Sequence, residues 1–94
     1  MAQKLDEAAR KGLAARLPGW TMATGRDAIQ RTFKFKDFSE AFGFMARAAL
    51  VAEKMDHHPE WTNVWNRVDV TLSTHSEGGV TQNDHDLAAA IDDL

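Results

Sequence analysis

Pro59 divides the sequence into two stretches with different hydrophobic patterns. The residue before a proline is disfavoured in the helical region, so a helix that approaches from the N-terminal side must end at about His57. Before Pro59, residues 38–55 carry apolar side chains at helical spacing. After it, residues 61–75 are rich in strand-type alternation. The boundary therefore places two adjacent histidines, His57 and His58, between a predicted helix and a predicted strand.

The predicted helix has an unusually wide apolar face. Either Asp37 or Ser39 can cap its N-terminus. Its two apolar stripes consist of Phe38, Phe42, Met45, Ala49 and Ala52, and of Phe44, Ala48, Val51 and Met55. A surface helix usually shows a narrower stripe. Either a second subunit or the N-terminal helix is expected to cover the excess, and the sequence leaves both open.

The remaining elements follow from turn signals and periodicity. A short helix over residues 3–17 ends at Pro18-Gly19. Residues 20–24 and 28–35 are strand candidates that form a hairpin, the second alternating with a period of two. A second hairpin turn is predicted at Asn66-Arg67, which would place Trp65 opposite Val68.

A last helix is predicted from a capping box at residues 81–84, with Asp84 in the place of the usual Glu or Gln. The apolar residues on one face of this helix are Leu87, Ile91 and Leu94. The order helix, two strands, helix, two strands, helix predicts the α+β class. The expected architecture is a two-layer sandwich, with a four-stranded antiparallel sheet and helices packed on one face.

Composition excludes several classes of function. Ninety-four residues are expected to form a single domain over residues 1–94. A net charge of −3 argues against nucleic acid as a partner. No apolar run is long enough to span a membrane, and no signal-peptide pattern opens the chain. The absence of cysteine excludes disulfides and thiolate metal sites, and it fits a cytoplasmic location.

Histidine side chains titrate near neutral pH. Two of the four histidines lie within residues 53–61, and a third lies further on in Thr74-His75-Ser76. Histidine is the commonest metal ligand. However, the helical zinc motif places its histidines four residues apart on one face, whereas His57 and His58 are adjacent. Asp56-His57-His58 also matches a phosphoesterase signature, but those enzymes need more carboxylates and a larger scaffold. We therefore expect no metal.

Proton transfer is the interpretation that these residue types favour. An imidazole gives and takes a proton near neutral pH without a large pKa shift. Glu53 precedes His57 by one helical turn and could orient it. A structural interpretation stands beside this one, because a His-His-Pro at a helix end can simply cap carbonyls and Asp84 can simply serve the capping box. The indole rings of Trp61 and Trp65 are expected in the core.

A wider pattern surrounds the histidines. Residues 53–61 read Glu-Lys-Met-Asp-His-His-Pro-Glu-Trp, residues 63–66 read Asn-Val-Trp-Asn, and residues 71–75 read Thr-Leu-Ser-Thr-His. These stretches resemble the pterin-4a-carbinolamine dehydratases, and the likeness extends upstream through residues 25–29, 33–38 and 41–45. It covers nearly the whole chain beyond the first dozen or so residues. His-His-Pro alone is a weak signal, but its combination with the later Thr-His is highly specific.

The resemblance implies an enzyme, a hydro-lyase that acts without metal or organic cofactor. Its substrate is 4a-hydroxytetrahydrobiopterin, the product that aromatic amino acid hydroxylases leave from their pterin. The enzyme dehydrates it to quinonoid dihydropterin and water. This step recycles the pterin and belongs to tetrahydrobiopterin biosynthesis. The implied partners are the pterin substrate and further copies of the chain, as a homodimer or homotetramer joined through the 38–55 helix. An aromatic amino acid hydroxylase is a candidate partner.

Matched position by position, the resemblance implies a set of site residues. The catalytic residues are His57, His58 and His75. The substrate-binding residues are His57, His58, Pro59, Thr74, His75, Ser76 and Glu77. Asp84 matches the family's nearby acid. We count it as a supporting residue together with Glu53, chosen for its spacing from His57, and Trp61.

We hypothesise that His57 and His75 act as acids toward the 4a-hydroxyl from different sides. His58 would bind the pterin ring or take the N5 proton, and Glu53 would partner His57. The alternative function is a protein-binding module, which acts as a dimerisation cofactor or hydroxylase regulator with catalysis incidental.

Overall fold

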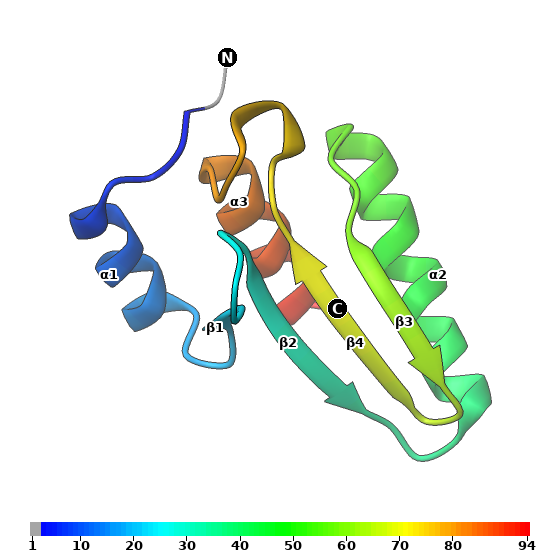
Figure 1. The fold of residues 1–94 in the computed structure, drawn as a ribbon. Coiled ribbons are helices and arrows are strands. Elements are labelled where there is room, and N and C mark those ends of the chain that lie inside the picture. The colour runs from blue at the N-terminus through cyan, green and yellow to red at the C-terminus, as the bar shows by residue number, and fades with distance from the viewer. Residues whose placement is uncertain (1–2) are drawn as a thin grey trace.

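The computed structural model describes residues 3–94 (Figure 1). The elements in chain order are α1 (Glu7–Arg16), β1 (Thr21–Met22), β2 (Ile29–Lys34), α2 (Phe38–Met55), β3 (Glu60–Val64), β4 (Arg67–Leu72), the short 3-10 helix η1 (His75–Glu77) and α3 (Gln82–Asp92). The strands form one antiparallel sheet in the order β1-β2-β4-β3. The predicted α+β class and the predicted order of helices and strands are confirmed.

The alternation of β4 separates the two faces of the sheet. This strand pairs with β2 on one side and β3 on the other. Val68, Val70 and Leu72 point to the covered face and are almost fully buried, while Asp69 and Thr71 lie on the open face. Figure 1 shows α2 and α3 behind the sheet and α1 beside its β1 end. The helices therefore leave the other face of the sheet uncovered.

The core lies between this face and the helices. The rings of Phe33 on β2 and Phe44 on α2 pack with their centroids 4.7 Å apart. Leu87 and Ile91 of α3 are buried as predicted, and burial of each contributes about 1.5–3 kcal/mol. Leu94 was expected on the same face but is 45% exposed. That expectation is wrong because α3 ends at Asp92, so Leu94 no longer follows the helical face.

The N-terminal helix begins at Glu7 rather than at Gln3. Lys4 forms an isolated bridge with Thr81, and the backbone N–H of Leu5 donates to the carbonyl of Val80 at 2.8 Å. These contacts hold the first described residues in an extended conformation. Asp6 then caps the helix by accepting from the N–H of Ala9 at 2.8 Å.

The central helix ends before the histidines. Its N-cap is Asp37, one of the two predicted candidates. Its last residue is Met55, and Asp56 follows in the left-handed conformation with φ 52°. Aspartate tolerates this conformation better than most residues. The helix therefore stops two residues earlier than Pro59 alone indicated, and His57 lies in the loop.

The second hairpin turns one residue earlier than predicted, at Trp65 and Asn66. Val64 pairs with Arg67, so Asn63 rather than Trp65 lies opposite Val68. Asn66 is held by Phe35, whose carbonyl accepts from the Asn66 side chain at 2.9 Å. The prediction of Trp65 as a core residue is wrong because it projects from the turn and is 64% exposed. Trp61 packs against the core as predicted.

The two apolar stripes of α2 have different environments. Phe44 and Ala48 of the second stripe are buried against the sheet and α3, so of the two alternatives left open by the sequence, cover by the N-terminal helix does not hold. Phe38 and Phe42 of the first stripe are 50% and 58% exposed, and the neighbouring Leu50 is 73% exposed. The apolar residues left uncovered thus lie along α2. Over residues 3–94, no helix is both long enough and apolar enough to cross a membrane.

Asp27 ties the N-terminal helix to the sheet and to the segment before α3. Its carboxylate accepts two hydrogen bonds from Arg10, at 2.5 and 2.8 Å, and one from the backbone N–H of Val80 at 3.4 Å. A Cβ atom on Gly79 would collide with this carboxylate. The hydrogen bonds from Arg10 are the main reason that the pKa of Asp27 is lowered.

Replacing Asp27→Asn should lower the free energy of unfolding by about 1–2 kcal/mol, because the partly buried Arg10 loses its anionic partner. The folded-state pKa of Asp27 lies below its unfolded value of about 4, so this stabilisation is present above that pH and is lost as the pH falls below it. Urea denaturation at about pH 7 and about pH 3 measures it. Asp69→Asn, another acid-to-amide change, is the control, and equal losses in both variants would contradict the role given to Asp27.

Candidate active site

A pocket of about 330 Å³ opens where the loop after α2 meets the segment after β4. Its lining residues are Asp56, His57, His58, Pro59, Glu60, Ser73, Thr74, His75 and Ser76. Six of the seven predicted substrate-binding residues are among them. Glu77 is the exception, although it follows Ser76 directly in η1. Asp56, Glu60 and Ser73 line the pocket without having been predicted.

The sheet topology explains why segments distant in sequence meet here. β4 runs between β2 and β3 and is antiparallel to both. The C-terminal end of β4 therefore lies beside the start of β2 and the start of β3. Thr74 and His75 follow β4, while Pro59 and Glu60 lead into β3. One end of the sheet thus collects both histidine-containing segments.

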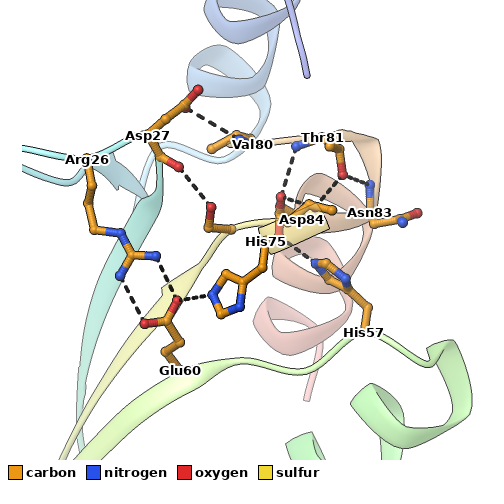
Figure 2. Close-up of polar contacts among 11 residues, drawn as sticks. Arg26, Asp27, His57, Glu60, His75, Val80, Thr81, Asn83 and Asp84 are labelled. Atoms are coloured by element: carbon orange, nitrogen blue, oxygen red, sulfur yellow. Dashed lines mark hydrogen bonds and ion pairs between the residues drawn. The ribbon is translucent and has the colours of Figure 1, made fainter. Parts of the chain in front are cut away.

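His57 contacts Asp84 on α3. Its Nε2 lies 2.5 Å from Asp84 Oδ1, and the His57 side chain is only 11% exposed (Figure 2). Asp84 is fully buried, and its Oδ2 accepts from the hydroxyl of Thr74 at 2.8 Å and from the backbone N–H of Thr81 at 2.9 Å. Asp84 therefore completes the predicted capping box and also holds the imidazole of His57. The capping interpretation is confirmed, and the supporting role at the active site stays a prediction that the contact with His57 fits.

Glu53 pairs with His58 and not with His57. The distance from His58 Nε2 to Glu53 Oε1 is 2.7 Å. The predicted pairing of Glu53 with His57 assumed a continuous helix, but the left-handed turn at Asp56 redirects the chain. His57 then points toward α3, and its neighbour points back along α2. His58 and Glu53 are both well exposed, so their contact is weak.

His75 contacts Glu60, which is held in turn by Arg26 (Figure 2). His75 Nε2 lies 3.0 Å from Glu60 Oε2. The guanidinium of Arg26 donates to both carboxylate oxygens of Glu60, at 2.9 and 2.8 Å. These bonds from Arg26, followed by the contact with His75, lower the pKa of Glu60 to about 2. Glu60 is therefore an anion at every pH at which an imidazole titrates.

Arg26 and Glu60 were not predicted as site residues. Glu60 lies within the conspicuous 53–61 stretch, but no spacing rule connects it with His75. Arg26 lies in the turn before β2, far from that stretch in sequence. The sequence held only an indirect signal for these two residues. Once β2 and β3 are placed on either side of β4, the residues at the start of both strands must lie near Thr74.

A second groove of about 420 Å³ adjoins the pocket. Its lining residues are Ala49, Leu50, Ala52, Glu53, His58, Pro59 and Trp61. His58 and Pro59 line both hollows. Glu53 and Trp61, the other two supporting residues of the prediction, thus lie beside the pocket rather than in it.

The arrangement suits proton transfer. Each of three imidazoles is paired with a different carboxylate. Within residues 3–94, no group of three or more metal-ligating side chains is gathered to hold an ion. A carboxylate on one ring nitrogen fixes the tautomer and leaves the other nitrogen to exchange a proton with a bound molecule.

Comparisons with known proteins agree on one family. The family profile described as "Pterin 4 alpha carbinolamine dehydratase" matches residues 3–94. A relative from Bradyrhizobium diazoefficiens, named provisionally as a pterin-4-alpha-carbinolamine dehydratase, is 63% identical over 97% of this chain and 91% of its own. A relative from Paraburkholderia xenovorans with the same provisional name is 58% identical over all of this chain and 98% of its own.

A solved structure has the same fold. The crystal structure of a protein described as a transcriptional coactivator/pterin dehydratase from Brucella melitensis matches with a TM-score of 0.93 and 57% identity. The match covers 97% of each chain. The sheet topology and helix placement described above are therefore those of a solved relative.

Asp84→Asn and Asp84→Ala should separate the two contacts of this residue. Asparagine keeps an oxygen for Thr81 and Thr74, so its free energy of unfolding should fall by only about 1 kcal/mol. Alanine leaves the buried backbone N–H of Thr81 without its acceptor, removes one partner of the Thr74 hydroxyl and removes the capping side chain, which should cost about 2–4 kcal/mol. Urea denaturation measures both. Equal stability of the two variants would show that the buried acceptor does not hold α3 to β4.

Proposed function

Because this chain belongs to the pterin-4a-carbinolamine dehydratase family, we propose that it is a hydro-lyase that dehydrates 4a-hydroxytetrahydrobiopterin to quinonoid dihydropterin and water. The observation that carries the proposal is the pocket in which His57, His58 and His75 each contact a carboxylate. The reaction would recycle the pterin used by aromatic amino acid hydroxylases in the cytoplasm, a location that the cysteine-free sequence supports.

The proposed reaction needs one proton delivered and one removed. The bond between C4a and the hydroxyl oxygen breaks, and the oxygen leaves as water after it accepts a proton. N5 loses its proton, and its electrons form the double bond to C4a. Both transfers suit groups that titrate near neutral pH. No oxidant or reductant is required.

We assign the acid roles to His57 and His75. They approach the pocket from different segments, His57 from the loop after α2 and His75 from η1 (Figure 2). Acids on two sides of the ring could protonate the hydroxyl on either face of the pterin. His58 lines both the pocket and the second groove. We assign it to ring binding or to removal of the N5 proton.

A binding function is the second candidate, favoured by the exposed apolar residues of α2. The exposed fractions of these side chains are 50% for Phe38, 58% for Phe42 and 73% for Leu50. We propose that this face joins copies of the chain into a dimer or tetramer. The same face could bind a hydroxylase or another protein, and the Brucella melitensis relative is described as a transcriptional coactivator as well as a dehydratase.

His57→Ala and His75→Ala should each lower kcat/KM for the dehydration by about 10²-fold or more, the usual contribution of a general acid. Stopped-flow absorbance with freshly generated 4a-hydroxytetrahydropterin measures the rate. If the two histidines serve opposite faces, each variant should slow one 4a epimer more than the other.

His85→Ala is the matched control, because His85 lies on α3 outside the pocket lining. Its rate should stay close to that of the wild type, and a chelator should leave the wild-type rate unchanged. Wild-type kcat/KM in both His57→Ala and His75→Ala would refute the assignment. A large loss on chelation would restore the metal-site interpretation.

Phe42→Lys should shift the protein to a smaller assembly, because it places a charge within the apolar face of α2. Sedimentation velocity at micromolar concentration measures the assembly. Gln30→Lys adds the same charge on the open face of the sheet and should leave the mass unchanged. A Phe42→Lys protein of wild-type mass would mean that this face does not join the subunits.

A further inference from the structure

Arg26, Glu60 and His75 form a connected set at the edge of the pocket (Figure 2). They come from three segments: the turn before β2, the first residue of β3, and the first residue of η1. Because β2 and β3 flank β4, Arg26 and Glu60 reach each other across the C-terminal end of β4, where the chain continues to His75. The sheet thus brings the three side chains together.

His57 and His75, the two proposed acids, differ in how firmly their rings are held. His57 is almost buried, and its partner Asp84 is fixed by Thr74 and Thr81. The His75 side chain is 75% exposed, so packing does little to hold its ring. Within the described part of the chain, Glu60 is the one hydrogen-bond partner of the His75 ring. The orientation of His75 therefore depends on Glu60.

Arg26 decides where the Glu60 carboxylate points. A bidentate contact with a guanidinium fixes the plane of a carboxylate as well as its position. The same contact keeps the pKa of Glu60 at about 2, so the group that faces His75 stays a hydrogen-bond acceptor. An ionised carboxylate can only accept, which requires the proton of the His75 ring to lie on Nε2.

We propose that Arg26 and Glu60 are positioning residues for His75, which hold its Nε2–H and leave Nδ1 as the nitrogen that exchanges a proton with the substrate. The inference rests on the proposed dehydration for its catalytic consequence. Its structural part, the tautomer and orientation of His75, does not.

Glu60→Gln tests the structural part. Glu60 Oε2 faces both Arg26 and His75, whereas Oε1 faces Arg26 alone. Glutamine removes the anion, and with its oxygen in the Oε1 position its NH₂ group faces His75 Nε2 and favours the tautomer with the proton on Nδ1. Ring 15N chemical shifts of the free protein measure the tautomer. We expect wild-type His75 in the Nε2–H form and a shift toward the Nδ1–H form in the variant, with the shifts of His57 unchanged.

The kinetic part uses the same variant. Because Glu60 acts through His75, kcat should fall about tenfold or more while KM changes by less than about threefold. Arg26→Lys keeps the charge but loses the bidentate geometry, and it should give an intermediate kcat. Thermal unfolding checks that both variants fold.

Asp69→Asn is the matched control. Asp69 is paired with Arg67 at 3.2 Å, and its side chain is 40% exposed, against 41% for Glu60. It lies on the same open face of the sheet but contacts no residue of the pocket. The change removes an equal charge and should leave both the His75 shifts and kcat at wild-type values.

The outcomes distinguish this inference from the proposed function. An inactive wild-type protein refutes the dehydration, while the 15N shifts still decide whether Glu60 sets the tautomer of His75. An active wild type with unchanged His75 shifts or unchanged kcat in Glu60→Gln overturns the inference alone. If Glu60→Gln fails to fold, Arg26→Lys decides by the same two measurements.

Discussion

The buried carboxylate of Asp84 is the interaction on which both the fold and the pocket depend. A fully buried carboxyl group is tolerated only when its oxygens are hydrogen-bonded, and those of Asp84 contact Thr81, Thr74 and His57. These contacts join the start of α3, the end of β4 and the loop after α2. The cap of α3 and the contact with His57 therefore share one carboxyl group, and under the proposed function a change at Asp84 should affect both stability and proton transfer.

The three imidazole–carboxylate pairs at the pocket differ in how firmly the carboxylate is held. His57 and Asp84 are buried, and the carboxylate is fixed from several directions. His75 is exposed, but Arg26 fixes its partner Glu60. His58 and Glu53 are both exposed, and among residues 3–94 the Glu53 carboxylate has no side-chain partner beyond His58. A fixed partner suits a group that must deliver a proton to a defined atom, whereas the loosest pair suits ring binding.

The sequence was sufficient to predict the elements and their order, because periodicity and capping residues are local signals. The contacts of the site depend on geometry that is not local. The pairing of Glu53 with His58 instead of His57 follows from the left-handed Asp56, which Pro59 did not reveal. The contact of Arg26 with Glu60 joins positions 34 residues apart, and it could be inferred only after the strand order was known. The family resemblance named the histidines and the acid Asp84, but not Glu60 and Arg26, which hold His75.

The exposed apolar residues of α2 adjoin the groove beside His58 at Leu50 and are separate from both hollows at Phe38 and Phe42. Leu50 belongs to the exposed apolar residues of the helix and also lines the groove next to His58. A subunit or partner that covers Leu50 would therefore narrow the approach to His58. Phe38 and Phe42 lie in the first turns of the helix and line neither hollow. If copies of the chain associate through these residues as proposed, substitution at Phe42 should alter association without touching the pocket, whereas substitution at Leu50 should change both.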